Sequence, residues 1–420
     1  MILWSLYVGP LVAINGDRLL QRIDELAQIG AIPDTNGSSR LAFTDADREG
    51  RDLVVTWMRD LGLHVTIDTV GNVIASTSEN GAADAVMAGS HIDTVGTGGR
   101  YDGNLGVLAG LEVIEATFAA GIDLKRPLAV AFFSNEEGSR FPPDMMGSLA
   151  YVGGMSVEEV LNVEGADGSR VGDELDRIGY RGTTPCPGVT PHAFLELHIE
   201  QGPVLDREDI RIGIVESVQG ISWTEVSLSG QSNHAGTTPM NLRRDPMYVA
   251  AEIAVIARSI ATEFGGSQVA TVGSINLHPN LVNVVPATAT MTVDLRNTDD
   301  RQLQKSENEL LERAHRFATA EGVELTSRSL ARFEPVEFDQ RVVDRIENLA
   351  MKSELSTRRM PSGAGHDAQM MARICPTGMI FVPSWEGISH NPAEHTEPED
   401  LVAGAQLLAD AMLELTEVDW

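Results

Sequence analysis

Side chains that bind divalent cations follow an apolar segment in the first quarter of the chain. Residues 89–93 read GSHID and come directly after the apolar run 85–88, which places them at the carboxyl end of a predicted parallel strand, where open α/β sheets bind their ligands. His91 and Asp93 are two positions apart, so on an extended chain their side chains point the same way. This spacing suits an imidazole that binds a metal and a carboxylate behind it that fixes its tautomer. A capping aspartate beside a surface histidine would give the same pattern.

Three more acidic residues lie in loops next to apolar segments. Asp102 belongs to the glycine-rich loop 98–106, which matches neither a G-x-G-x-x-G nor a Walker pattern and therefore does not indicate a nucleotide. A carboxylate in such a loop, near a metal-binding histidine, could instead bridge two cations. Glu136 and Glu137 follow the apolar run 128–133. This pair suits one carboxylate that binds a cation and one that accepts a proton, although adjacent glutamates are also common on solvated surfaces.

Two histidines further along the chain have similar neighbours. His198 lies at the polar end of an alternating strand, where Glu196 and Glu200 share its face, and His390 lies in a loop near the C-terminus. Nitrogen and oxygen ligands without thiolates suit zinc, manganese, cobalt or nickel in a hydrolytic site with an open position. Four histidines lack such neighbours and are expected to be structural or solvent-exposed: His64, His192, His278 and His315.

An alternation of helices and strands in the first 215 residues must position these side chains. The helical spacing of apolar residues after Asn15 and Asp17, either of which can be the cap, predicts the first helix. The runs 85–89 and 128–133 are continuously apolar, which is typical of strands buried on both faces of an α/β sheet. Further helices are predicted over 45–61 and 105–120, further strands over 64–70 and 72–75, and loops with a short helix over 160–190.

The pattern changes at residue 218 and changes back after residue 333. Between these points, strand and helix signals follow in the order β-α-β-β-α-β, which is the split βαβ arrangement of a ferredoxin-like module. The sequence therefore predicts an α/β fold with a larger mixed-sheet, metallopeptidase-like catalytic domain, residues 1–217 and 334–420, and an inserted α+β domain, residues 218–333. The strands of the inserted domain are predicted over 221–229, 268–276, 287–296 and 323–330, and its helices over 246–264 and 299–320.

Composition excludes several classes of function. The 420 residues include 31 basic and 61 acidic side chains, a net charge of −30, and such a field repels nucleic acid and anionic membranes. Cys186 and Cys375 form no disulfide framework and have no catalytic setting, so a cytoplasmic protein is expected. No segment has transmembrane length, and the apolar residues 1–14 lack signal-peptide features and are expected to pack against the body of the protein. We expect no nucleic-acid or membrane partner.

Six stretches carry a resemblance that extends from the first predicted helix to the end of the chain. They are GSHIDTVGTGGRYDGNLGVLAGLEV, FFSNEEGSRF, ELHIEQGPVL, SNHAGTTPM followed by RRD, PSGAGHDAQ and SHNPAEHT. Together they resemble the M20 family of two-metal amidohydrolases and aminopeptidases. Within it, the chain is similar to the branch of N-carbamoyl-L-amino acid hydrolases and allantoate amidohydrolases. His198 marks this branch, since many M20 peptidases have an acidic residue at that position.

The resemblance implies two divalent metal ions per subunit, zinc or else manganese, cobalt or nickel. The implied ligands are His91, Asp102 and His198 for one ion, and Asp102, Glu137 and His390 for the other, with Asp102 bridging. Asp93 would orient His91. Glu136 would be the general base, which takes a proton from a metal-bridging water and later returns a proton to the leaving nitrogen.

In the resembled family the smaller domain acts as a lid and forms the dimer contact, which implies a homodimer. From this domain, His234 would reach into the other subunit's site and stabilise the oxyanion, and Asn283 and Arg296 would bind the substrate's carboxylate. Without the resemblance, Arg296 at a strand end is typical of a surface charge, and His234 is ambiguous. The larger domain would line the pocket with Gln201, Gly363, Ala364, Gly365 and His366.

The implied reaction is metal-dependent hydrolysis of the carbamoyl group of an N-carbamoyl-L-α-amino acid, giving the amino acid, ammonia and carbon dioxide. Allantoate, ureidoglycolate and β-ureidopropionate are alternative substrates, because each also joins a ureido group to a carboxylate. The partner in every case is a small-molecule ureido acid. His198 disfavours an N-acyl amino acid deacylase or dipeptidase on the same scaffold. A non-catalytic binding protein is disfavoured because every expected ligand and the base are present.

Overall fold

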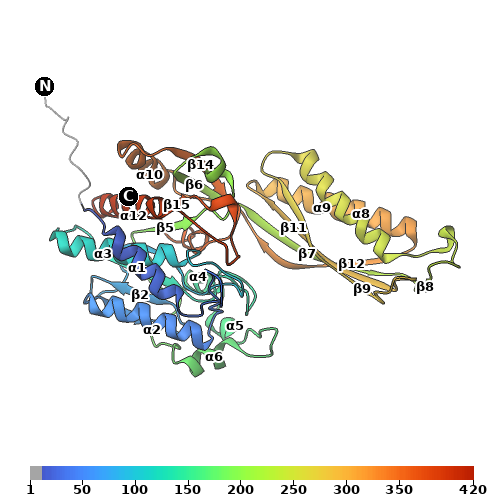
Figure 1. Cartoon of the computed structure of the whole chain (residues 1–420), viewed down its shortest axis with the longest axis horizontal. Coiled ribbons are helices and arrows are strands. Elements are labelled where there is room, and N and C mark those ends of the chain that lie inside the picture. Colours follow the sequence, from blue (N-terminus) through green and yellow to red (C-terminus); the bar gives the residue numbers. More distant parts are fainter. Residues whose placement is uncertain (1–11) are drawn as a thin grey trace. The chain divides into compact units, whose positions relative to one another are not determined.

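The structure, a computed structural model, describes residues 12–420 and divides into two compact units (Figure 1). The smaller unit is Ser217–Glu337, and the larger unit comprises the described residues before and after it. The predicted packing of residues 1–14 falls for the most part outside the described residues. Of that segment, Val12 is buried and its carbonyl accepts a hydrogen bond of 2.9 Å from the side chain of Gln406.

A large mixed sheet positions the candidate site. Its strands are β1 (His64–Ile67), β2 (Val73–Ser76), β3 (Val86–His91), β4 (Leu128–Phe133), β5 (Ala193–Ile199), β6 (Ile212–Val218), β13 (Val336–Glu337), β14 (Thr357–Ser362) and β15 (Thr377–Val382). Within residues 12–420 the strand order is β1-β2-β4-β3-β5-β15-β6-β13, and β14 pairs with β6. β4, β3, β5 and β15 run parallel, whereas β1, β2 and β6 are antiparallel to their neighbours. β3 and β4 are buried along their whole length, as their continuously apolar sequences predict.

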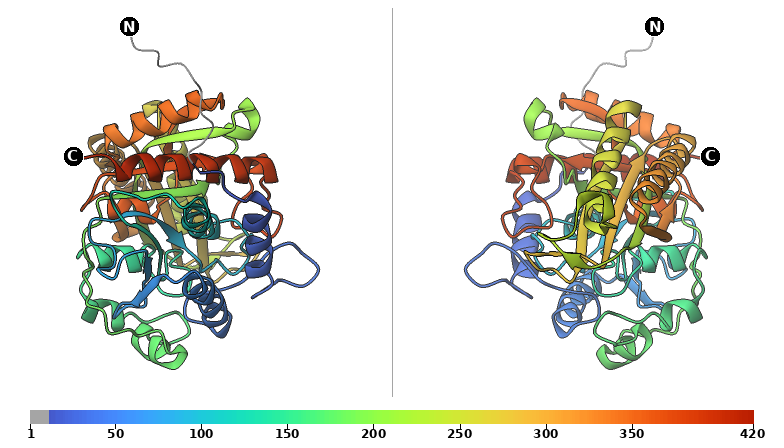
Figure 2. Two further views of the ribbon diagram at one scale, coloured as in Figure 1. Left: turned by 90° about the vertical axis from the view of Figure 1, so that its left-hand side faces the viewer. Right: turned by 90° about the vertical axis from the view of Figure 1, so that its right-hand side faces the viewer.

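Helices cover this sheet in two groups. The helices of the larger unit are α1 (Gly16–Ala27), α2 (Asp45–Asp60), α3 (Asn104–Ala120), α4 (Met146–Tyr151), α5 (Val157–Leu161), α6 (Val171–Ile178), α7 (Val204–Glu208), α10 (Gln340–Lys352), α11 (Asp367–Met371) and α12 (Pro398–Thr416), with the 3₁₀ turn η2 (Trp385–Gly387). α3 packs on β3, β4 and β5, and α12, the red helix of Figure 2, packs on β5 and β15 beside α10. α3, α10 and α12 thus form one group, and the short helices α4 and α11 form the other.

Local capping determines where the first helices begin. The Asn15 side chain accepts the backbone N–H of Arg18 at the start of α1, and the Thr44 side chain accepts that of Asp47 at the start of α2. Of the two caps that the sequence allows for α1, the structure therefore uses Asn15. None of the helices within the described residues is both long and apolar enough to cross a membrane.

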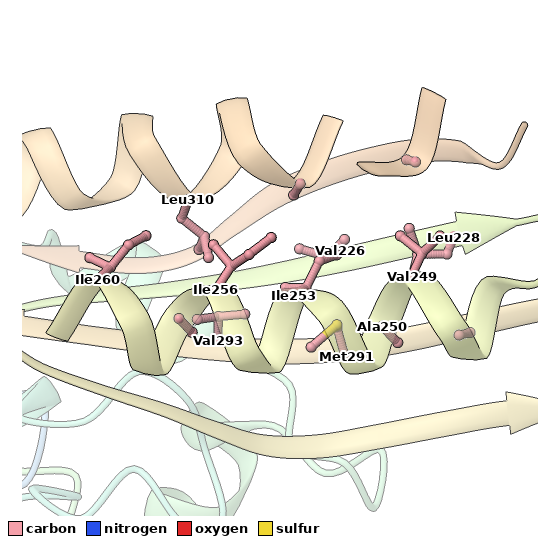
Figure 3. Close-up of a cluster of buried hydrophobic side chains, with 14 of the residues drawn as sticks. Val226, Leu228, Val249, Ala250, Ile253, Ile256, Ile260, Met291, Val293 and Leu310 are labelled. Atoms are coloured by element: carbon pink, nitrogen blue, oxygen red, sulfur yellow. The ribbon is translucent and has the colours of Figure 1, made fainter. Parts of the chain in front are cut away.

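The smaller unit has a four-stranded antiparallel sheet with two helices. Its elements are β7 (Gly220–Ser229), β8 (Asn233–His234), η1 (Met240–Leu242), α8 (Pro246–Phe264), β9 (Val269–His278), β10 (Val284–Val285), β11 (Thr288–Asn297), α9 (Asp300–Glu321) and β12 (Glu324–Phe333). The main sheet has the order β12-β7-β11-β9, and β8 pairs with β10. Figure 3 shows Ile253, Ile256 and Ile260 of α8 packed against Val226 and Met291 of the sheet. Helical spacing on α8 and alternation along the strands direct these apolar side chains into one core.

Candidate metal centre

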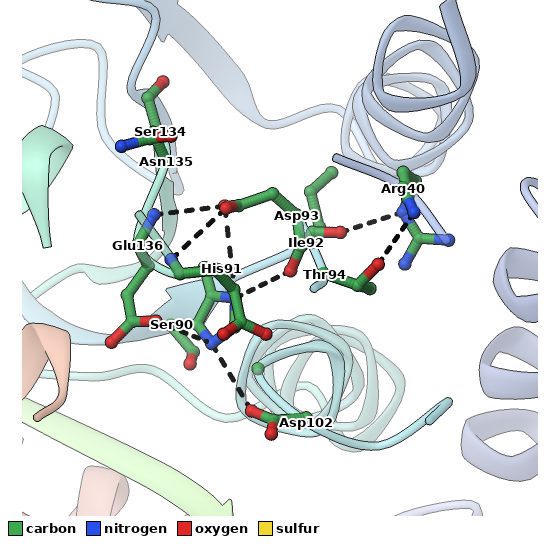
Figure 4. Close-up of polar contacts among 12 residues, drawn as sticks. Arg40, Ser90, His91, Ile92, Asp93, Thr94, Asp102, Ser134, Asn135 and Glu136 are labelled. Carbon is green, nitrogen blue, oxygen red and sulfur yellow. Dashed lines mark hydrogen bonds and ion pairs between the residues drawn. The ribbon is translucent and has the colours of Figure 1, made fainter. Parts of the chain in front are cut away.

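Three of the residues predicted to bind a metal converge in the larger unit. His91 ends β3, His198 lies near the end of the neighbouring parallel strand β5, and Asp102 lies in the loop before α3. Asp102 Oδ1 is 3.6 Å from His91 Nε2 and 3.2 Å from His198 Nε2, and all three residues are buried. Figure 4 shows His91 facing Asp102. They meet because the carboxyl ends of parallel strands share one edge of a sheet.

Backbone carbonyls orient both imidazoles. His91 Nδ1 lies 2.9 Å from the carbonyl oxygen of Asp93, and His198 Nδ1 lies 2.9 Å from that of Ile199. A proton on each Nδ1 makes that nitrogen the donor, which leaves a lone pair on each Nε2 beside Asp102. That of His198 accepts the Gly103 N–H at 3.1 Å. The sequence predicts the carboxylate of Asp93 behind His91, but its nearest oxygen is 4.0 Å away. In the structure the backbone carbonyl of Asp93 is therefore the group closest to this nitrogen, and the carboxylate lies further away.

The Asp93 carboxylate has other partners. Its two oxygens accept the backbone N–H groups of Glu136 and Glu137, each at 3.3 Å, and Figure 4 shows the bond to Glu136. These bonds hold the turn after β4 against the end of β3. Burial raises the pKa of Asp93 to about 7, and the charge of Asp47 contributes to the same rise.

His91, Asp102 and His198 form a first cluster of possible ligands. A second cluster, Asp102, Glu137 and His390, shares Asp102 with it. His390, in the loop between β15 and α12, has its Nε2 3.4 Å from Asp102 Oδ2 and 3.3 Å from Glu137 Oε2. Asp102 therefore presents one oxygen to the two buried histidines and the other to His390. The ligand atoms within each cluster lie within 4.8 Å of one another. The His390 side chain is 51% exposed, so this second cluster is the one nearer to solvent.

Glu136 lies beside the first cluster without belonging to either cluster. Its Oε2 is 3.4 Å from His91 Nε2, and the residue is buried. Burial raises the pKa of Glu136 well above its usual range, and the charges of Asp367 and Glu137 raise it further. The pKa of Glu137 is raised in the same way, first by burial and then by Asp102. Divalent cations would offset the repulsion among these buried carboxylates.

The donor set of the two clusters fits a divalent metal. Both consist of imidazole nitrogens and carboxylate oxygens, without a thiolate, which is the ligand chemistry of zinc and other first-row metals in hydrolytic sites. The buried histidines, aspartate and glutamate therefore suit a divalent metal site at this edge of the sheet.

A third group of possible ligands has other partners in the structure. Glu196, His198 and His366 approach one another closely. However, the Glu196 carboxylate accepts the Ser90 hydroxyl at 2.6 Å and the Ala368 N–H at 2.8 Å. Glu196 therefore joins β3, β5 and α11, and we assign it a structural part.

Two of the residues predicted to line the pocket from the larger unit, Gln201 and His366, lie beside the clusters. Gln201 donates from Nε2 to Asp102 Oδ2 at 2.8 Å. His366 is buried with its ring centre 4.6 Å from that of His198, and its Nε2 lies 2.8 Å from Ser362 Oγ. The segment that joins β14 to His366 consists of Gly363, Ala364 and Gly365.

In the smaller unit, His234 and Asn283 are neighbours. His234 in β8 pairs with Val284 of β10, and the Ala235 N–H donates to the Asn283 carbonyl at 2.9 Å. The His234 side chain is exposed, and its Nδ1 accepts the N–H of Gly236 at 3.0 Å.

Arg296 lies far from these two residues. It is near the end of β11, eight positions from Thr288 at the start of that strand, which corresponds to about 26 Å at the rise of a β-strand. Its guanidinium pairs with Asp294, with Nη2 2.9 Å from Oδ2. The sequence predicts that Asn283 and Arg296 share one substrate carboxylate. Within one copy of the smaller unit they are too far apart, because β10 holds Asn283 beside His234 at the opposite end of the sheet.

A comparison with protein families shows to which family the chain belongs. Residues 87–414 match Peptidase family M20/M25/M40. The chain belongs to this family. The predicted family membership is confirmed, and so is the mixed α/β fold class.

M20 relatives match the chain over nearly its whole length. The N-carbamoyl-L-amino-acid amidohydrolase of Rhizobium meliloti is 37% identical over 406 residues, 96% of this chain and 97% of the relative. The allantoate amidohydrolase of Escherichia coli (strain K12) is 37% identical over 404 residues, 93% of this chain and 95% of the relative. A crystal structure of a hydantoinase/carbamoylase family amidase from Burkholderia multivorans has a TM-score of 0.91 at 42% identity and covers 98% of this chain and 100% of that one.

Arg40 supports the site of this M20 chain, and no sequence pattern indicated this role. Arg40 is fully buried, and it donates from Nε to the Ile92 carbonyl at 2.8 Å and from its backbone N–H to Thr94 Oγ1 at 2.7 Å (Figure 4). Its Nη2 donates to Asn104 Oδ1 at 2.8 Å. It therefore ties the segment after His91 to the start of α3. Burial lowers the pKa of Arg40 to about 10, and a single arginine between polar and apolar residues carries no distinctive sequence signal.

In this M20 chain, a substitution at Gly103 tests whether the close approach of this residue fixes the position of the His91 ring. Gly103 has a φ of 66°, and a Cβ there would overlap the His91 ring. We expect Gly103→Ala to weaken metal binding by about 10–100-fold, the range for changes behind a metal ligand, in a metal titration of the apo-protein. Gly121→Ala is the matched control. Gly103 precedes α3 and Gly121 follows it, with a φ of 64° and nothing within 4 Å of its Cβ position. Equal losses in both variants would contradict a role of Gly103 in seating the ring.

Proposed function

We propose that this chain hydrolyses the carbamoyl group of N-carbamoyl-L-α-amino acids and releases the amino acid, ammonia and carbon dioxide. The observation that carries the proposal is the pair of ligand clusters that share Asp102, with the Glu136 carboxylate beside them. The names of relatives support the substrate class, since two of them, from Rhizobium meliloti and Geobacillus stearothermophilus, are N-carbamoyl-L-amino acid amidohydrolases at 37% identity.

Two divalent cations would complete the site, zinc or else manganese, cobalt or nickel. The residues that would hold them are His91, Asp102 and His198 for one, and Asp102, Glu137 and His390 for the other. When bound, such cations polarise the substrate's carbonyl and lower the pKa of water. The shared carboxylate of Asp102 supports this arrangement, because its two oxygens face different clusters.

Glu136 would carry the proton between the two halves of the reaction. Because it belongs to neither cluster, its carboxylate stays available to take a proton from the attacking water and to return one to the leaving nitrogen. Burial raises the pKa of Glu136 above its usual range, which makes its carboxylate a stronger base than an exposed one.

A homodimer would supply the remaining contacts. Within one copy of the smaller unit, Arg296 lies near the end of β11, whereas His234 lies in β8 beside β10, which comes just before the start of β11. One small substrate therefore cannot contact both. We therefore assign Arg296 of one copy to the substrate's carboxylate and His234, with Asn283, of a second copy to the carbonyl that develops negative charge. Gln201 and His366, with residues 363–365, would line the pocket beside the clusters.

Subunit mixing tests the shared site. His234→Ala and Glu136→Gln should each be inactive alone, since each removes one half of the machinery. In a statistical mixture half of the dimers are mixed and one of their two sites is intact, so we expect recovery of about a quarter of wild-type activity. Mixed dimers that form, as verified by two different affinity tags, and yet remain inactive would contradict the assignment of His234 to the partner's site.

A substrate panel tests the reaction itself. Free primary amine and free ammonia should be measured on metal-loaded enzyme with N-carbamoyl-L-amino acids, N-carbamoyl-β-alanine, allantoate, ureidoglycolate, an N-acetyl amino acid and a dipeptide. We expect amine and ammonia to rise together on an N-carbamoyl-L-amino acid. Amine without ammonia would instead identify a deacylase or peptidase and overturn the proposal.

A second candidate is hydrolysis of allantoate or ureidoglycolate. It is favoured by relatives with those names, the allantoate amidohydrolase of Escherichia coli at 37% identity and a ureidoglycolate hydrolase of Oryza sativa at 35%. These substrates also combine a ureido group with a carboxylate, so the same residues would serve. Ammonia from one of them, with none from the N-carbamoyl-L-amino acids, would select this candidate.

A further inference from the structure

Glu394 is a buried carboxylate in the loop that carries His390, and neither ligand cluster includes it. It is 3% exposed. Its Oε1 accepts the backbone N–H of Tyr101 at 3.0 Å and that of Asp102 at 3.3 Å. The loop after β15 is therefore joined, through one side chain, to the loop that carries the shared ligand Asp102.

Two smaller contacts connect the same two loops. Thr97 Oγ1 donates to the His390 carbonyl at 3.2 Å. The Ser389 hydroxyl lies 3.1 Å from Asp102 Oδ2 and 3.5 Å from Glu394 Oε2. Glu394 therefore stands at the centre of a set of bonds between the segments 97–102 and 389–394.

Gly99 leaves space for the Glu394 carboxylate. A Cβ at Gly99 would overlap both Oε1 and the carboxyl carbon of Glu394. A glycine at position 99 thus allows the side chain to lie flat against the loop and reach the two N–H groups. Without those bonds a carboxylate buried next to Asp102 would be costly, since it would lose hydration and meet a like charge.

We propose that Glu394 is a positioning residue that fixes the Asp102 loop against the His390 loop, so that Asp102 and His390 face one cation. This inference rests on the proposed two-cation site. It predicts a selective effect, because His91 and His198 are held by their own strands and backbone carbonyls. Loss of Glu394 should therefore weaken the cation held by Asp102, Glu137 and His390 more than the other, which shares Asp102 but keeps His91 and His198 in place.

Metal binding is the decisive measurement. Apo-protein is titrated with Co²⁺ by absorption spectroscopy, and the metal retained after gel filtration is counted by mass spectrometry. We expect two cations for the wild type. For Glu394→Ala we expect the cation held by His390 to bind about 10–100-fold more weakly, and the cation held by His91 and His198 to be weakened by a smaller factor. Glu397→Ala is the matched control, because it removes a carboxylate three positions further along whose side chain is 63% exposed. It should bind both cations as the wild type does.

Two further variants separate positioning from charge and from misfolding. Glu394→Gln keeps an oxygen that accepts the two N–H groups, so both cations should bind within about threefold of wild-type affinity, the spread of a modest hydrogen-bond change. Gly99→Ala keeps the Glu394 side chain but pushes its carboxylate away from the two N–H groups. It should therefore reproduce the loss seen in Glu394→Ala. If Glu394→Ala does not fold, Gly99→Ala carries the test.

Each outcome has one meaning. Two cations of unchanged affinity in Glu394→Ala, or in Gly99→Ala if only that variant folds, would overturn the positioning role. A loss in Glu394→Gln as large as in Glu394→Ala would also overturn it, because charge would then be the cause. Fewer than two cations in the wild type would instead refute the proposed two-cation site.

Discussion

Replacement of Glu136 by Gln is expected to lower kcat on the best N-carbamoyl-L-amino acid by about 10²–10⁴-fold, the usual contribution of a general base. The amide has nearly the same shape as the carboxylate, but it cannot take a proton from water or give one to the leaving nitrogen. Glu136 lies beside the clusters and belongs to neither. The variant should therefore keep its bound metal, and KM should change by only a few-fold.

The measurement combines steady-state kinetics with the metal content of the same sample. A fall in kcat together with a loss of metal would mean that Glu136 acts as a ligand, and its assignment as the base would be wrong. Near-wild-type turnover with metal bound would contradict the mechanism altogether. Added ammonia or amino acid should not change the residual activity of Glu136→Gln, since the defect of this variant lies in proton transfer.

Asp102→Asn is expected to abolish binding of both cations and to lower activity by at least about 10³-fold, as loss of the metal chemistry removes several kcal/mol of transition-state stabilisation. Asp102 Oδ1 faces His91 and His198, and Oδ2 lies 3.4 Å from His390. The amide keeps one oxygen and replaces the other by an NH₂ group, which donates hydrogen bonds and cannot ligate a cation. The variant also loses the negative charge that both clusters share, so a single substitution should disable both clusters.

Thermal unfolding with and without metal provides a second readout for Asp102→Asn. At a metal concentration of 100 Kd, each binding site stabilises the folded state by about 2.7 kcal/mol, and the variant should lose this metal-dependent rise in Tm. Asp24→Asn is the control, because Asp24 pairs with Arg100 of the same loop at 2.7 Å and is exposed. Its metal-dependent rise should equal that of the wild type. Retention of two cations by Asp102→Asn would contradict the bridging role.

Local sequence patterns were enough to predict many of the elements around the site and the types of residue at their ends. Helix starts depend on side chains within one turn, so Asn15 could be recognised as one of two possible caps of α1 without any knowledge of the fold. Continuous apolar runs identified β3 and β4 as buried strands, and the position of His91 after such a run was enough to nominate it as a ligand. The prediction for the first strand was too long. Asp68 accepts the N–H groups of Val70 and Asn72 and turns the chain after β1.

How these residues are held, and which of them can act together, depends on contacts between segments that are distant in the sequence. The backbone carbonyl of Asp93 orients His91 because the carboxylate is engaged by the turn after β4, which lies about 40 positions further along. Strand length and register separate Arg296 from His234, and Glu394 reaches Tyr101 across a sequence separation of 293 residues. Caps and periodicity depend on residues a few positions apart, whereas these contacts arise from the packing of distant segments, which no local pattern encodes.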